Sequence, residues 1–245
     1  MDALTLGMVA GVMLLAAAVQ GAVGFGFGLV AVAILSLALP VEEAAVLSAV
    51  PGLAINLGLC WRFRRCVSPR RLTPMVIAVI VATPLGVLLL DEAAARPLYA
   101  LLAAVLVASV VHGAWPKRTH RPGHPLWMGI PMGGLAGVLA GVFGSGGPPL
   151  VAYIASQRFQ KYRYLASLQA VLAVANTVRL VALVQRGTLQ PRHLLPSGIG
   201  VVAAISGVAI GLIVLRRFSP GGLRIAVWLL LTAIAVRCGL QAVAA

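Results

Sequence analysis

Two glycine-rich clusters could bind a ligand inside an otherwise apolar chain. They are VQGAVGFGFG, residues 19–28, and AGVFGSGGPP, residues 140–149. Glycine weakens a helix and proline removes backbone donors, so both clusters are predicted to be broken or re-entrant helix. Such a break frees backbone N–H groups, and the positive end of the helix that follows attracts an anion. The candidate binding residues in the clusters are Gly24, Phe25, Gly26, Phe27, Gly144, Ser145, Gly146 and Gly147.

Close packing of helices through small residues is the alternative interpretation of glycine in such runs. It is the favoured interpretation for Gly7, Gly11, Gly133 and Gly137, which have the spacing of small-residue contacts. The GSGGPP segment favours a binding site instead, because glycines flank its serine and two prolines are expected to stop the helix there.

Three further polar residues lie inside apolar runs and are candidate substrate ligands. Asn56 and Asn176 are the only two asparagines in the chain, and their amides either bond neighbouring helices or contact a substrate. Arg179 follows Asn176 by three residues, on the same helical face, and the second half contains no carboxylate to pair with it. Extension of the Arg179 side chain toward a lipid headgroup is the alternative. Weaker candidates of the same kind are Gln20, Gln169, Thr177, Ser167 and Tyr153.

The distribution of charge excludes several classes of protein. All five carboxylates lie in the first 92 residues and outside the apolar runs, whereas cation antiporters and pumps place carboxylates at the bilayer midplane. Three cysteines without a CxxC pair and four unpaired histidines predict no metal site, no cofactor and no catalytic residue, so no enzyme. The net charge of +14 is partly topological, yet it favours an anion as the cargo. The expected partners are this small anion and the lipid bilayer, with no nucleic acid; a homodimer is left open.

Composition fixes the fold class. Of the 245 residues 61% are hydrophobic and 10% charged, with a mean hydropathy of +1.03, which is typical of an all-α, polytopic transmembrane helical bundle. Eight apolar runs are long enough to span a bilayer, at about 3–20, 44–61, 73–90, 97–115, 126–143, 165–185, 194–215 and 221–243. The runs 27–40 and 148–156, which follow the glycine clusters, are too short to span alone.

The chain also contains a candidate internal repeat. A shift of 120 residues superposes three glycines of the two clusters and places Asn56 over Asn176. The predicted repeats are residues 1–117 and 118–245, each opening with a glycine-broken helix. Basic loops at 62–71 and in the linker should face the cytoplasm and the turn at Asp91 the other side. Placing the basic residues at 158–163 and 216–224 in the cytoplasm as well favours inverted repeats over a parallel arrangement of four spans each.

The segment from residue 144 to residue 180 resembles the TauE/SafE family of membrane permeases, the sulfite and organosulfonate exporter group. The matching elements are Gly144-Ser145-Gly146-Gly147-Pro148, Arg163, Asn176 and Arg179, with Gly24-Phe25-Gly26-Phe27-Gly28 and Asn56 as first-half counterparts. One departure is Leu59 at the first-half position that matches Arg179.

That resemblance implies a multi-pass transporter that exports a small sulfur-containing or organic anion across the inner membrane. Sulfite, sulfonates and carboxylates are not separated by these motifs. The expected mechanism is alternating access around one central site between the two glycine clusters. An anion channel of similar architecture is the alternative, and an integral-membrane enzyme is a weaker one.

Overall fold

The computed structural model describes residues 3–67, 69–92, 95–114, 125–157, 159–217, 232–233 and 235–237. These residues form α-helices and short 3-10 helices, with no strand among them. In order, the helices are α1 (Ala3–Val23), α2 (Phe27–Leu35), α3 (Val41–Phe63), η1 (Arg64–Cys66), α4 (Pro69–Glu92), α5 (Ala95–Ala114), η2 (Leu126–Met128), α6 (Gly129–Phe143), α7 (Gly147–Ser156), α8 (Lys161–Gln185) and α9 (Pro191–Arg217). The predicted all-α class is confirmed.

Six segments are long and apolar enough to cross a membrane: α1, α3 with η1, α4, η2 with α6, α8 and α9. They confirm six of the eight predicted spans and identify a polytopic membrane protein. The predicted span 97–115 corresponds to α5, whose apolar part, Arg96–Val111, is shorter. The predicted span 221–243 falls almost wholly outside the described residues, as does the predicted boundary between the halves at residues 117 and 118.

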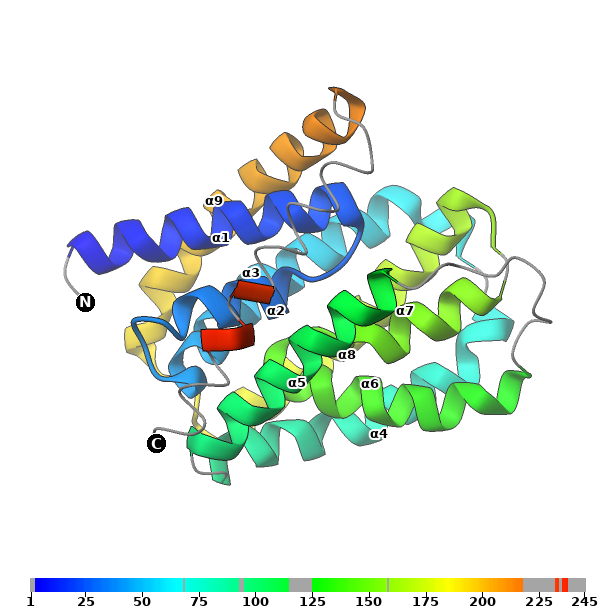
Figure 1. Ribbon diagram of the computed structural model, residues 1–245, viewed down its shortest axis with the longest axis horizontal. Helices are drawn as coiled ribbons and strands as arrows, with labels where there is room; N and C mark the ends of the chain where they lie inside the picture. Colours follow the sequence, from blue (N-terminus) through cyan, green and yellow to red (C-terminus); the bar gives the residue numbers. More distant parts are fainter. Residues whose placement is uncertain are drawn as a thin grey trace.

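The short apolar runs form short helices. Helix α2 has nine residues and α7 has ten, so at about 1.5 Å per residue neither spans the hydrocarbon core. Helix α2 is the most enclosed element, because all of its residues except Ile34 are buried. In Figure 1, α2, α3, α5, α7 and α8 lie between an α1–α9 pair on one side and an α4–α6 pair on the other.

Glycines bring the outer helix pairs into close contact. A Cβ added to Gly137 of α6 would lie 2.9 Å from the Val79 carbonyl oxygen of α4. A Cβ added to Gly21 of α1 would lie 2.7 Å from the Val208 oxygen of α9. The packing interpretation is therefore confirmed for Gly137, and Gly133 makes the same kind of contact with Met75.

The same interpretation is wrong for Gly7 and Gly11. Both are exposed in the structure, and a Cβ on either would meet nothing within 4 Å.

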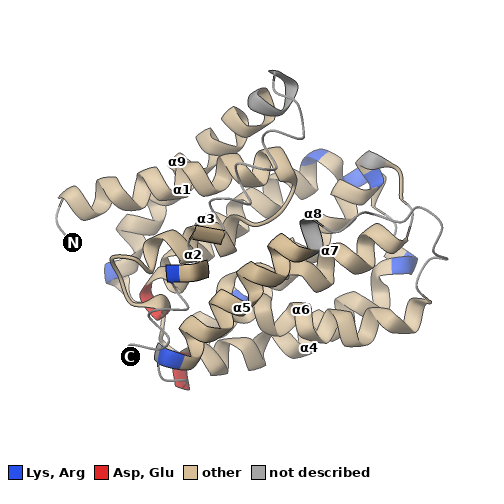
Figure 2. Ribbon diagram, in the orientation of Figure 1, with Lys and Arg blue, Asp and Glu red and all other residues tan. Residues whose placement is uncertain are grey.

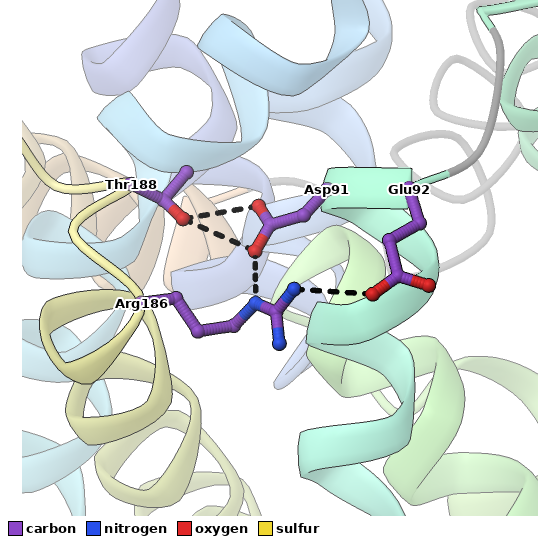
Figure 3. A network of polar contacts seen from close by, with 4 residues as sticks. All are labelled: Asp91, Glu92, Arg186 and Thr188. Atoms are coloured by element: carbon purple, nitrogen blue, oxygen red, sulfur yellow. Dashed lines mark hydrogen bonds and ion pairs between the residues drawn. The ribbon is translucent and has the colours of Figure 1, made fainter.

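Apart from the buried Arg179, the charged residues of the described part gather at the two ends of the helices (Figure 2). At one end, Nη1 of Arg71 donates to the Gln157 carbonyl oxygen at 3.4 Å, and Phe63 stacks on Tyr162. At the other end, the turn after α8 meets the end of α4: Arg186 pairs with Asp91 and Glu92, and Thr188 donates to Asp91 (Figure 3). The hydrogen bond from Arg186 to Asp91 raises the pKa of the Arg186 guanidinium. The loop 62–71 thus shares an end with residues 157–162, opposite the acidic turn.

Candidate functional site

Residues 24–26, the first glycine turn, separate α1 from α2. Gly24 and Gly26 have φ of 95° and 104°, in the left-handed region that favours glycine. The Gly24 N–H still donates to the Gln20 carbonyl oxygen at 2.6 Å, closing the last turn of α1. The chain then reverses into α2. These two conformations explain why the helix ends inside an apolar run.

Residues 144–146, the second glycine turn, separate α6 from α7. Gly144, with φ of 69°, ends α6 and donates to the Ala140 oxygen at 2.8 Å, and Gly147 has φ of 54°. Gly146 has an ordinary φ of −69°. The expectation that the two prolines stop the helix is wrong: Gly144 ends α6, and the prolines lie in the first turn of α7. Proline is tolerated there because N–H groups of a first helical turn have no intrahelical partner.

The start of α2, just after the first glycine turn, meets the second glycine turn in the interior. A Cβ on Gly28, the second residue of α2, would overlap the Phe143 carbonyl oxygen and the backbone of Gly144. A Cβ on Gly52 of α3 would lie 3.3 Å from the Phe27 ring and 3.7 Å from Oδ1 of Asn176. The start of α2, the end of α6, α3 and α8 therefore converge at one place.

A network of side-chain amides surrounds the first glycine turn. Nε2 of Gln20 donates to Oδ1 of Asn56 at 2.7 Å, and the Phe27 N–H donates to Oε1 of Gln20 at 3.0 Å. Nε2 of Gln169 donates to the Gly24 oxygen at 2.7 Å. All of these side chains are buried. Gln20 and Gln169 were only weaker candidates from the sequence, where nothing but their position in apolar runs marked them.

Arg179 holds the end of α6. Its side chain is 0% exposed, so the alternative in which it extends toward a lipid headgroup is wrong. Its Nε donates to the Gly141 oxygen at 2.9 Å, and its Nη2 to the oxygens of Val142 at 3.1 Å and of Ala45 at 2.9 Å. Gly141 and Val142 lie in the last turn of α6, where carbonyl groups lack helical partners and the helix dipole is negative. A cation is stabilised at such a helix end.

Four buried side-chain atoms of the described residues have no hydrogen-bond partner: Nη1 of Arg179, Oδ1 of Asn176, Oγ of Ser145 and Oγ of Ser167. A Cβ added to Gly144 would overlap Nη1 and lie 3.4 Å from Oδ1 of Asn176, so both atoms face the second glycine turn. No carboxylate of the described residues pairs with Arg179. A buried guanidinium with a free N–H pair is costly without a counter-ion, and it is well suited to hold an anion.

The structure separates the other predicted residues from this polar cluster. Gly146 faces Leu150 and Ala136, and Gly147 faces Leu139 and Val105, which are apolar neighbours. Phe25 is partly buried against an apolar cluster. Among the weaker candidates, Thr177 bonds only the Ala173 oxygen of its own helix. The Tyr153 hydroxyl lies 3.3 Å from the Arg71 oxygen, at the basic end of the molecule.

No group of three or more His, Cys, Asp or Glu side chains in the described part of the chain could hold a metal ion. The convergence point presents side-chain amides, backbone groups and the guanidinium of Arg179.

Comparison with known proteins places the chain. A curated relative from Cupriavidus necator, the probable sulfite/organosulfonate exporter TauE, is 27% identical over 209 residues, which are 82% of this chain and 79% of the relative. No solved structure matches the chain. The model of the sulfite exporter TauE/SafE family matches residues 9–238, and the chain belongs to that family.

Proposed function

We propose that this protein exports a small sulfur-containing anion, of the sulfite or organosulfonate class, across the inner membrane by alternating access. The site lies between the two glycine turns, with Arg179 as its fixed positive charge. One observation carries the proposal: a fully buried guanidinium has an unpartnered Nη1 at the second glycine turn, and no described carboxylate neutralises it. The anion supplies the missing counter-charge.

The chemistry of the site suits a tetrahedral or pyramidal oxoanion. The free Nη1 group offers two N–H donors, and the Ser145 hydroxyl, in the second glycine turn, offers another. Charge-assisted hydrogen bonds of this kind are roughly twice as strong as neutral ones. The printed name of the Cupriavidus necator relative, a probable sulfite/organosulfonate exporter, supports the sulfur-containing class.

The driving force requires no intramembrane carboxylate. An inside-negative potential of about 100 mV favours the exit of a monovalent anion by about 2.3 kcal/mol. The described spans contain no acid apart from Glu42, Glu43, Asp91 and Glu92, at helix ends. Export therefore runs down the potential and the substrate gradient.

The moving parts are two inverted repeats, residues 1–117 and 118–245, each opening with a glycine-broken helix. Two helix contacts support this division. Gly21 lies against Gly211, and Gly141 lies against Gly86. The shift that relates the clusters carries Gly21 onto Gly141, and a shift of 125 carries Gly86 onto Gly211. The broken helix of each repeat thus packs on a helix of the other repeat in equivalent ways.

The ends of the helices support inversion. Arg71 bonds Gln157 at one end, whereas Asp91 bonds Arg186 at the other. With the basic loop 62–71 in the cytoplasm, a cysteine at Arg65 should react with an impermeant maleimide only from the cytoplasmic side, and one at Thr188 only from the outer side. Labelling of both from one side would contradict inverted repeats.

The direct test of function is anion efflux from proteoliposomes. Vesicles that contain the purified protein and sulfite or methanesulfonate should release the anion faster than protein-free vesicles, with a rate that saturates. A membrane potential set across the vesicles with potassium and valinomycin should change the rate of efflux. Unitary currents in planar bilayers would favour a channel, and no anion flux at all would remove the proposal.

A further inference from the structure

We infer that Gln20 and Gln169 are positioning residues of the transport site, which fix the first glycine turn and thereby set the affinity for the anion. The inference rests on the proposed function. It assigns a role to two side chains that contact neither Arg179 nor the second glycine turn through any hydrogen bond.

Gln20 closes the first glycine turn on itself. Its main-chain oxygen accepts the Gly24 N–H at 2.6 Å, and its side-chain Oε1 accepts the Phe27 N–H at 3.0 Å. Backbone groups at the end of one helix and at the start of the next lack intrahelical partners. One residue thus binds both sides of a three-residue turn, and the turn cannot open without breaking these bonds.

Gln169 ties the same turn to α8. Its Nε2 donates to the Gly24 oxygen at 2.7 Å, and its Oε1 lies 3.5 Å from Nε2 of Gln20. Gln20 in turn donates to Asn56 of α3 at 2.7 Å. The first glycine turn is therefore held between three helices, α1, α3 and α8, by side chains that are all at least 98% buried.

Helix α8 holds both glycine turns with one face. Gln169 and Asn176 are seven residues apart, close to two helical turns, and Arg179 follows one turn later. Gln169 bonds the first turn, whereas Asn176 bonds the Gly144 oxygen of the second at 3.3 Å. A single rigid helix consequently sets the spacing between the two turns.

Movement of the first turn must reach the anion site. Gly28 packs against Phe143 and Gly144 so tightly that a single Cβ would overlap their backbone. A packed contact of this kind transmits displacement, because protein interiors are close to incompressible. Loosening the amide network therefore shifts Gly144, which lies against Nη1 of Arg179 and Oδ1 of Asn176.

The amide at position 20 also keeps the site cationic. A carboxylate at this position could accept the Phe27 N–H equally well. It would, however, add a negative charge in a buried region beside the start of α2, which packs on Gly144. This charge would offset the charge of Arg179. A neutral amide holds the backbone without this competition.

The experiment compares Gln20→Met, Gln20→Glu and Gln169→Met in the full-length protein, with Gln185→Glu as the control. Gln185 is exposed at the end of α8, outside the network. Amide hydrogen exchange of residues 20–28 is measured without any anion. Efflux of methanesulfonate is measured separately, normalised to folded protein, so that KM and maximal rate are resolved.

Gln20→Met and Gln169→Met should speed exchange at residues 20–28. Each should also raise KM by about 3- to 10-fold, the change that corresponds to the loss of one neutral hydrogen bond. Gln20→Glu should raise KM by more than about tenfold. Gln185→Glu should match the wild type.

Unchanged exchange at residues 20–28 would overturn the inference even if the wild type transports the anion. If the variants only reduce the amount of folded protein and leave KM unchanged, the two glutamines have a structural role alone, and the inference is overturned. If exchange responds but the wild type releases no anion, the proposed function fails while the positioning of the turn stands.

Discussion

The two glycine turns have similar backbones and different chemistry. In both, a glycine at positive φ follows the helix, and the start of α2, just after the first turn, packs on Gly144 of the second. The first is held by neutral amides that satisfy one another. The second is held by Asn176 and Arg179, and it carries three of the four unpartnered buried atoms of the described residues. The shared backbone provides the interrupted helices, and only the second turn provides charge.

The sequence shift between the clusters explains this difference. It places Ala140 over Gln20, Ala49 over Gln169 and Leu59 over Arg179. The glycines and the asparagines are common to both halves, whereas the glutamine and arginine side chains occur in one half each. In the proposed account, one turn serves as a neutral support and the other binds the anion.

The largest expected difference concerns an added methyl group at each turn. The Cβ added by Gly26→Ala meets nothing within 4 Å. The substitution should therefore lower stability only by the strain of a side chain at positive φ, about 1–2 kcal/mol. Gly144→Ala adds overlap with the Arg179 guanidinium, a further loss of about 1–3 kcal/mol. Thermal unfolding in detergent measures both. Equal losses would mean that Arg179 moves freely away from the second turn.

The two asparagines should differ in their effect on the substrate. Asn176→Ala removes the bond to Gly144 at the charged turn and should weaken anion binding by about 0.5–1.5 kcal/mol. Asn56→Ala leaves Nε2 of Gln20 with a single, longer contact to Gln169, and should affect stability more than binding. Calorimetric titration of both folded variants with sulfite checks this. The reverse order of binding losses would assign the anion to the first turn.

The smallest expected effect belongs to Ser145. Its hydroxyl is buried without a partner, so Ser145→Ala should leave stability unchanged or slightly higher while anion affinity falls by about 0.5–1.5 kcal/mol. Ser48→Ala is the matched control, because the Ser48 hydroxyl already donates to the Ala45 oxygen at 2.7 Å. An Ser145→Ala protein with wild-type affinity would remove this hydroxyl from the site.

Sequence reasoning predicted the membrane class and six of the spans, because hydropathy acts locally. It also predicted that Asn176 and Arg179 share a helical face. It did not predict which turn Gln20 and Gln169 support, since that depends on contacts between residues 149 positions apart. The prolines were misjudged because their effect depends on which turn of a helix they occupy, and Gly144 had already ended α6.

The direction of Arg179 likewise could not be predicted. A long basic side chain in a span either reaches the headgroups or turns inward, and the choice depends on whether carbonyl groups are available nearby. Here the buried end of α6, where carbonyl groups lack helical partners, supplies the oxygens of Gly141 and Val142. The feature that ends the helix thus also creates the partner for the arginine.

Anion binding by Arg179 variants tests the central claim most directly. Sulfite and methanesulfonate are titrated into folded wild type, Arg179→Lys and Arg179→Ala, and thermal stabilisation by the anion is followed in parallel. Lysine keeps the charge but loses the planar fork, so affinity should fall. Alanine should abolish measurable binding, a loss of at least about 1.5–3 kcal/mol. Wild-type affinity of the folded Arg179→Ala protein for either anion would contradict an anion site at Arg179.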